Sequence, residues 1–197
     1  EMCIRDSLYI EQGARIVGAF PSATEGYDPA EPNEHTQFQD FGHSHWKNSL
    51  IWGIGLEDIT ISGPGLIYGK GLTREESRLP GVGNKAISLK LCKNVTLKDF
   101  SLLHCGHFGL LATGVDNLSI LNVKVDTNRD GFDIDCCKNV RISHCTVNAP
   151  WDDAIVLKAS YGLGYFKDTE NVTISDCFVS GYDRGSCLLY TSDAADD

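Results

Sequence analysis

Residues 94–100 (N-V-T-L-K-D-F), 117–123 (N-L-S-I-L-N-V), 139–145 (N-V-R-I-S-H-C) and 171–177 (N-V-T-I-S-D-C) are four copies of one pattern, and they decide the fold. In each copy the first and third residues after the asparagine are apolar, and the residue between them is polar. That two-residue period predicts a β-strand. A related segment at 58–63, D-I-T-I-S-G, keeps the alternation without the asparagine.

A second apolar strand is predicted upstream of each asparagine. These strands are A-I-S-L-K (86–90), G-L-L-A-T (109–113), G-F-D-I-D (131–135) and A-I-V-L-K (154–158). No helical pattern lies between them, so a single repeat cannot bury its own apolar face and must stack on its neighbours. This predicts an all-β fold, a right-handed parallel β-helix. A leucine-rich horseshoe is the rival, but its L-x-x-L-x-L-x-x-N pattern is missing.

Stacked repeats should align equivalent positions into columns. The asparagines are expected to form a side-chain ladder at a tight turn, because asparagine tolerates the left-handed conformation. The residues after them should stack inside: Val95, Leu118, Val140 and Val172. A further column six residues after each asparagine should hold small buried hydrophobic groups: Phe100, Val123, Cys145 and Cys177.

The composition limits the partners. The chain has 197 residues, with 17 Lys and Arg against 27 Asp and Glu, a formal net charge of −10. Such a charge argues against nucleic acid or an anionic membrane as the main partner, and no apolar run is long enough for a transmembrane helix. The eight cysteines contain no C-x-x-C pair, so neither a structural metal nor a disulfide scaffold is expected.

The two ends read differently from the rest. Residues 1–7 (E-M-C-I-R-D-S) and 187–197 (C-L-L-Y-T-S-D-A-A-D-D) resemble translations of a sequencing-library adapter in its two orientations. We therefore expect both segments to be non-native and residues 8–186 to be a partial β-helix domain, truncated at both ends. Without native end coils, the chain by itself is expected to be poorly stable and inactive.

Two acidic clusters, N-R-D-G-F-D-I-D at 128–135 and W-D-D-A-I-V-L-K at 151–158, lie one repeat apart. Aligning their strands places Asp130 beside Asp153 and Arg129 beside Asp152. Carboxylates on adjacent strands, about 4.8 Å apart, cannot all stay ionised without an obvious cation for each, so one should keep its proton. A proton donor next to a base is what hydrolysis of a glycosidic bond requires. Solvated turns are the other interpretation of these residues.

The alternation within the first cluster predicts that Asp133 and Asp135 point outward. Asp135 then aligns with Lys158 on the next coil. A surface ion pair between these two residues and a substrate-binding role for Lys158 both fit this arrangement.

The paired motifs resemble the N-T-D-G-x-D-I-D and D-D-x-I-x-x-K-S signatures of glycoside hydrolase family 28, the polygalacturonases and rhamnogalacturonases. The segment at 49–71 is similar to that family's early coil. The resemblance implies a pectin-lyase-like solenoid that works as an inverting hydrolase of pectic polysaccharide, without metal or other cofactor. Asp152 would be the general acid, and Asp130 and Asp153 would activate water.

The resemblance also implies substrate-binding positions and a setting. Asn128, Arg129, Lys158 and Tyr182 are the expected substrate-binding residues. Arg129 stands where the family has threonine, and Tyr182 stands where it has the histidine of G-H-G; the family's R-I-K motif has no counterpart in the chain. We expect a monomer that is secreted or periplasmic, with a polysaccharide as its partner.

Two other functions remain open from the residues. A pectate-type lyase on the same fold would hold Ca²⁺ with several carboxylates and remove a proton with a cationic base. A non-catalytic β-helical glycan-binding or adhesin module would use the same acids as solvated edges. Sensitivity to chelators separates the first from a hydrolase, and loss of turnover on changing Asp152 separates the second.

Overall fold

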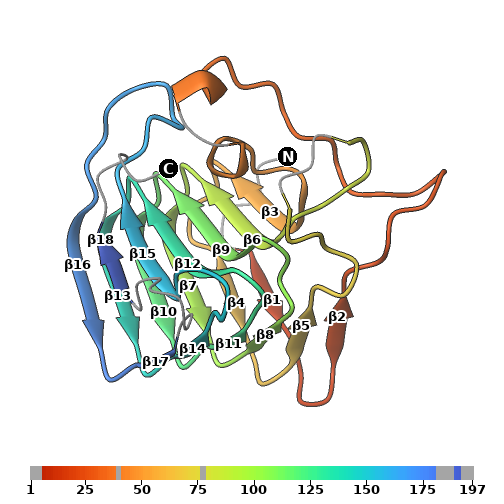
Figure 1. Ribbon diagram of the computed structural model, residues 1–197. Helices are drawn as coiled ribbons and strands as arrows, with labels where there is room; N and C mark the ends of the chain where they lie inside the picture. Colours follow the sequence, from red (N-terminus) through yellow and green to blue (C-terminus); the bar gives the residue numbers. More distant parts are fainter. Residues whose placement is uncertain (1–5, 39–40, 76–78, 181–188, 192–197) are drawn as a thin grey trace.

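The computed structural model describes residues 6–38, 41–75, 79–180 and 189–191, and they form a right-handed parallel β-helix (Figure 1). Three sheets of six strands each run along the stack, and every pairing between named strands is parallel. The all-β prediction is confirmed. Within the described ranges, none of the helices has the length and apolar character needed to cross a membrane.

Each of the three sheets takes its name from one feature: the asparagine ladder, its short strands, or the acidic clusters. The asparagine sheet contains β1 (Ser7–Tyr9), β4 (Thr60–Ser62), β7 (Lys93–Lys98), β10 (Asp116–Leu121), β13 (Lys138–Ser143) and β16 (Glu170–Ser175). The short-strand sheet contains β2 (Arg15–Val17), β5 (Leu66–Tyr68), β8 (Ser101–Leu103), β11 (Lys124–Asp126), β14 (Thr146–Asn148) and β17 (Phe178–Ser180). The site sheet contains β3 (Ser49–Ile54), β6 (Lys85–Lys90), β9 (Phe108–Thr113), β12 (Asp130–Asp135), β15 (Ile155–Lys158) and β18 (Leu189–Thr191).

The predicted strand register is confirmed on the asparagine sheet. Leu118 of β10 aligns with Val95 of β7 and with Val140 of β13, which in turn aligns with Val172 of β16. Val95, Leu118 and Val140 are at most 1% exposed, whereas Val172 in the last coil is half-buried. The column therefore loses its cover where the described stack ends.

The asparagine ladder forms at this sheet. Asn94, Asn117, Asn139 and Asn171 all have φ between 56° and 59°, the left-handed conformation that asparagine tolerates. Each side-chain amide donates to its predecessor's oxygen at 2.8–3.1 Å, and Asn94 donates to Asp58 at 2.8 Å. The ladder thus gives the side-chain amides of neighbouring coils hydrogen-bond partners along the stack.

The second predicted column is also inside. Phe100, Val123 and Cys145 are at most 1% exposed, while Cys177 in the last coil is half-buried. Burial raises the pKa of Cys145 to about 11, so this thiol stays protonated and packs as a small hydrophobic group.

A long segment between β2 and β3 covers the outer face of the site sheet. This covering segment comprises residues 28–48, of which 39–40 are not described, and it includes the short helices η1 (Thr36–Phe38) and η2 (Gly42–Ser44). In Figure 1 it is the orange stretch over the upper end of that sheet. The next strand begins at Ser49, so Trp46 lies before it and not in a strand. Trp46 is instead fully buried and packs with Phe108 and Leu111 against the sheet.

Candidate active site

The two acidic clusters meet at one edge of the site sheet, as their spacing predicted. Phe132 of β12 aligns with Ile155 of β15, which brings Asp130 level with Asp153. The backbone N–H of Gly131 donates to the carbonyl oxygen of Asp153 at 2.9 Å. A side chain at Gly131 would lie 2.3 Å from the carbonyl oxygen of Ala154, so glycine is required where these two coils touch.

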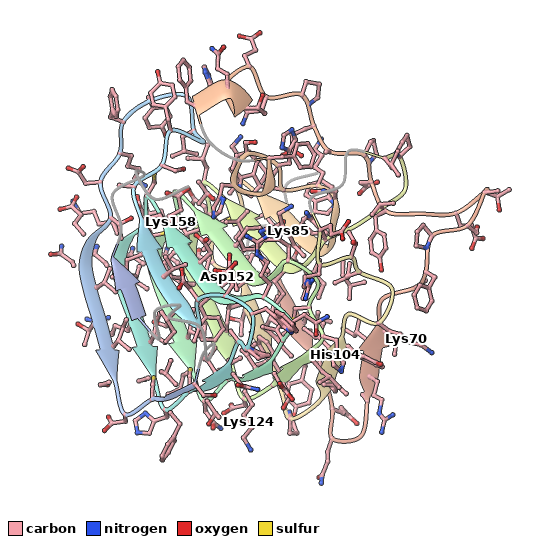
Figure 2. The ribbon with its side chains drawn as sticks, viewed as in Figure 1. Lys70, Lys85, His104, Lys124, Asp152 and Lys158 are labelled. Atoms are coloured by element: carbon pink, nitrogen blue, oxygen red, sulfur yellow. The ribbon has the colours of Figure 1, made fainter. Side chains whose placement is uncertain are left out.

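Arg129 bridges three coils at this edge. Its Nε donates to Oδ2 of Asp152 at 2.5 Å, and its Nη1 donates to Nδ1 of His107 at 3.1 Å. The expectation that the carboxylates lack an obvious cation is therefore wrong for Asp152, because the aligned Arg129 is its ion-pair partner. Both side chains are about one third exposed, and Asp152 is within reach of a ligand in solution. Figure 2 shows Asp152 over the strands of the site sheet.

Asp130 is the buried carboxyl of the set. Its side chain begins β12, it is 3% exposed, and its Oδ1 has no hydrogen-bond partner among the described residues. Burial, followed by the charges of Asp152 and Asp133, raises the pKa of Asp130 well above its usual range; Lys158 and His43 act in the opposite direction. Asp130 thus holds its proton more tightly than a free aspartic acid in solution does.

Asp133 and Asp135 point outward as predicted, but the expected position at the surface is wrong. Both point away from the coil interior, which Phe132 and Ile134 fill, but both are completely buried beneath the covering segment and the loop after β15. Asp135 aligns with Lys158 as predicted, yet it accepts hydrogen bonds from the backbone N–H and the hydroxyl of Ser160 at 2.7 and 2.6 Å. Burial and the charge of Asp133 raise the pKa of Asp135.

The covering segment contributes a residue that sequence reasoning missed, His43 in η2. Its Nε2 lies 2.8 Å from Oδ2 of Asp133 and 2.6 Å from Nζ of Lys158, and the side chain is buried. The Lys158 ammonium lies 3.5 Å from the same Asp133 oxygen. The sequence offered one signal, the H-S-H-W motif at 43–46, shortly after a polar stretch.

His43, Asp130 and Asp133 together have the composition of a metal site, with one ligand atom from each lying within 4.8 Å of the others. The ammonium of Lys158 enters this space and contacts both His43 and Asp133. The residues present therefore hold a cation of the chain's own, the Lys158 ammonium, rather than offering an open coordination site.

The remaining predicted residues are less central in the described structure. Asn128 accepts a hydrogen bond from Nδ1 of His104 at 3.0 Å, at the turn between the short-strand sheet and the site sheet. The backbone N–H of Asp153 donates to Oδ1 of Asp152 at 3.1 Å, which orients the acidic turn. Tyr182 lies outside the described residues.

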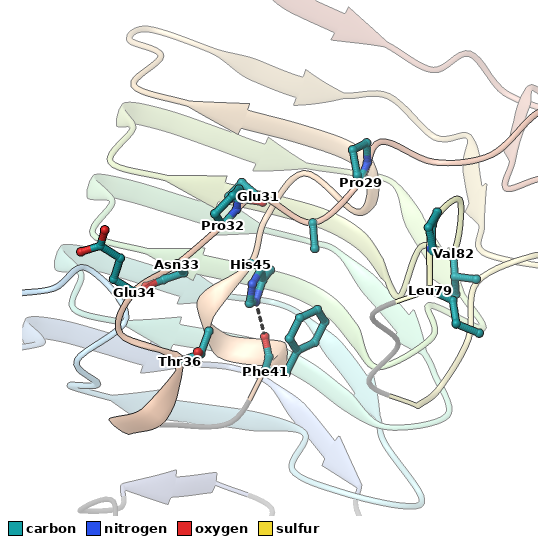
Figure 3. Close-up of a pocket in the computed structure, with 12 residues that line it drawn as sticks. Pro29, Glu31, Pro32, Asn33, Glu34, Thr36, Phe41, His45, Leu79 and Val82 are labelled. Carbon is teal, nitrogen blue, oxygen red and sulfur yellow. Dashed lines mark hydrogen bonds between the residues drawn. The ribbon is translucent and has the colours of Figure 1, made fainter.

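The covering segment also forms a cavity of about 430 Å³ with residues 79–82 (Figure 3). Glu31, Asn33, Phe41 and His45 are among its lining residues, and none of the predicted catalytic aspartates is. Glu31 itself binds the backbone N–H groups of Trp46 and Lys47, which folds the segment back on itself. The cavity is thus separate from the carboxylate cluster.

Comparison with known proteins agrees with this architecture. The family described as "Right handed beta helix region" matches residues 57–195. A polygalacturonase of Juniperus ashei is 28% identical over 174 residues, covering 76% of this chain and 32% of its own length. A polygalacturonase of Chamaecyparis obtusa is 28% identical over 150 residues, covering 68% of this chain and 27% of its own. The chain therefore spans about a third of the length of these relatives.

A solved structure gives the same result for the fold. The polygalacturonase from Erwinia carotovora superposes with a TM-score of 0.63 at 18% identity, over 89% of this chain and 53% of that one. At 18% identity this structural similarity shows the fold alone. Together with the relatives it confirms the resemblance stated from the motifs: the chain belongs to the right-handed β-helix family and is similar to the polygalacturonases of glycoside hydrolase family 28.

Proposed function

We propose that the full-length protein carrying this chain is an inverting glycoside hydrolase of pectic polysaccharide, with a uronate- or rhamnose-containing backbone as its substrate. The observation that supports this most is the stacking of Asp130 with Asp152 and Asp153 on adjacent coils. Two of these carboxyls are half-buried and one is buried with a raised pKa, so the three groups sit in different environments and can take different roles.

Hydrolysis with inversion requires different roles for Asp130, Asp152 and Asp153. Inversion needs an acid that protonates the leaving oxygen and a base, about 6.5 to 9.5 Å away, that activates a water on the opposite face of the sugar. In our proposal Asp152, the more accessible group, is the acid. Asp130 and Asp153 face the water.

Arg129 sets a condition on this assignment. Its guanidinium pairs with Asp152 in the resting chain. In our proposal the carboxylate of a uronate sugar draws the guanidinium away from Asp152. The residue that replaces the family's threonine thus links binding of an anionic substrate to release of Asp152 from its ion pair.

The test is release of reducing ends from polygalacturonate and rhamnogalacturonan by the full-length protein. Asp152→Asn should lower kcat by about 10² to 10⁴, the usual range for loss of a general acid. Asp176→Asn is the matched control, because Asp176 is exposed at a turn with φ of 53°, which asparagine also adopts. Equal activity of the two variants would overturn the role of Asp152 as the acid, and a parent that binds the polysaccharide without releasing reducing ends would favour a glycan-binding module.

Arg129→Thr separates the two roles of the guanidinium. If Arg129 recognises a uronate, the variant loses more kcat/KM on polygalacturonate than on a neutral oligosaccharide of the same length. Equal losses on both substrates would rule out this recognition.

The proposal extends to setting and assembly. A polymer of plant walls has to be met outside the cell, so we propose a secreted or periplasmic monomer. Fractionation of source cells and size-exclusion chromatography of the full-length protein check these two points.

A further inference from the structure

His43, Asp133 and Lys158 form a buried cluster behind the carboxylates. Two contacts in it require different protonation of one atom, Nε2 of His43. Nε2 of His43 faces Oδ2 of Asp133 at 2.8 Å and Nζ of Lys158 at 2.6 Å. Donation to Asp133 requires a hydrogen on Nε2, whereas acceptance from the Lys158 ammonium requires a bare Nε2. The histidine therefore couples the positions of the carboxylate and the ammonium, since it can serve only one of them fully at a time.

Asp130 lies within the field of this cluster. Four charged or titratable groups from three elements act on it: Asp133 on the same strand, Asp152 before β15, Lys158 at the end of β15, and His43 in η2. The two carboxylates raise the pKa of Asp130 further after burial has raised it, and Lys158 and His43 lower it. Asp135, His107 and Arg129 are further ionisable groups near the cluster. Ser160 donates to Asp135, and Arg129 contacts both His107 and Asp152.

Because Asp130 is buried, its ionisation depends on the two basic groups nearby, Lys158 and His43. Asp130 is 3% exposed and its Oδ1 has no partner among the described residues, so water contributes little to stabilising its charge. A base that accepts a proton from water must be ionised before the reaction. The ammonium of Lys158 is the compensating cation on this side of Asp130, and His43 holds it there.

We propose that His43 is a positioning residue: it fixes the Lys158 ammonium against Asp133 and beside Asp130, and so keeps Asp130 available as an ionised base. This inference rests on the proposed function for the role of Asp130, but the charge arrangement itself does not depend on that function. Because His43 belongs to the covering segment, seating of that segment on the site sheet completes the site.

The anchoring of the covering segment supports this dependence. Nε1 of Trp46 donates to the hydroxyl of Thr113 at 3.1 Å, and the side-chain amide of Asn33 donates to the carbonyls of Ser44 and Gly162. These bonds tie the segment to β9 and to the loop after β15. His43 is thus held from both sides of the cluster that it contacts.

The experiment follows the titration of the Asp130 carboxyl by carbon NMR in the full-length protein, with the resonance assigned by its loss in Asp130→Asn. Lys158→Met removes the cation and Lys158→Arg keeps it, so these two variants differ mainly in charge. We expect the Asp130 midpoint to rise in Lys158→Met and in His43→Asn, and to stay near the wild-type value in Lys158→Arg. His144→Asn is the control, because His144 is exposed at a turn with φ of 56°.

The pH profile of kcat/KM gives a second readout. Lys158→Met and His43→Asn should lose on the order of tenfold on the acidic side and recover most of it at higher pH, because the base ionises later. A purely structural role would lower activity at every pH without moving the midpoint.

The outcomes are separable. An Asp130 midpoint unchanged in both His43→Asn and Lys158→Met overturns the inference, whatever the activity. A raised midpoint in a protein that cleaves no glycan overturns the proposed function and leaves the positioning role supported. If Lys158→Met does not fold, the comparison of His43→Asn with Lys158→Arg decides, since only the first should shift the titration.

Discussion

The two faces of strand β12 are equally buried and chemically opposite. Phe132 and Ile134 face the coil interior and Asp133 and Asp135 face outward, and all four are at most 1% exposed. The inner face gains from removing hydrocarbon from water, whereas the outer face requires hydrogen bonds and cations to hold its carboxylates. Alternation along a strand therefore tells which way a side chain points, but not whether that side meets solvent.

The largest test of this comparison places a carboxylate on the inner face. Ile142 of β13 is fully buried in the core, and Ile142→Asp would leave a charge there without a partner. We expect the full-length protein to lose its cooperative unfolding transition, because such burial costs on the order of several kcal/mol. Circular dichroism during urea unfolding measures it. The neighbouring Arg141→Asp, at an exposed position on the same strand, should fold; similar loss in both variants would contradict the assignment of faces.

Removing a carboxylate from the outer face should have a moderate effect of opposite sign, a gain in stability. The pKa of Asp130 is raised above its ordinary value of 3.8, so the folded chain binds its proton more tightly than the unfolded chain. Stability from this group is present below about pH 4 and is lost as pH rises through the folded-state pKa. Asp130→Asn removes the charge and should raise the melting temperature at neutral pH, with the gain shrinking toward pH 4.

Thermal melts at the two pH values check this prediction. Asp176→Asn, on an exposed turn, should not change the melting temperature at either pH. An Asp130→Asn variant less stable than the parent at neutral pH would show that the buried carboxylate is stabilised rather than tolerated.

The smallest effect concerns the ladder at the edge of the stack. Asn117 donates to Asn94 at 2.8 Å and accepts from Asn139 at 3.0 Å, with φ of 59°. Asn117→Ala loses both bonds and strains the turn, and should cost about 1–2 kcal/mol in urea unfolding. Asn117→Gly loses the bonds but tolerates the turn, so it should cost less. Equal costs would mean that the conformation of this residue contributes nothing.

The fold was predictable because each coil repeats one local rule. The asparagine spacing, the alternation after Asn139 and the position of Gly131 each require only neighbouring residues or the next coil. The contact between Arg129 and Asp152 followed from the same alignment, although its consequence for the acid was not foreseen.

The buried outer cluster was not predictable for a definite reason. His43 reaches Asp133 across 90 residues of sequence, through a segment that repeats nothing and has no strand period. Once Trp46 anchors that segment, groups that alternation places outside become the interior of a second layer. Polar stretches that carry a Trp and a His close together are the signal to examine in such sequences.

The proposed mechanism requires that stacked carboxyls on adjacent coils direct a water molecule onto a glycosidic bond. Proton NMR of the first products released from a pectic oligosaccharide by the full-length protein tests it most directly. We predict saturated products whose new reducing end has the anomeric configuration opposite to that of the cleaved bond. Retained configuration would contradict the two-carboxylate water mechanism, and unsaturated products would identify a lyase.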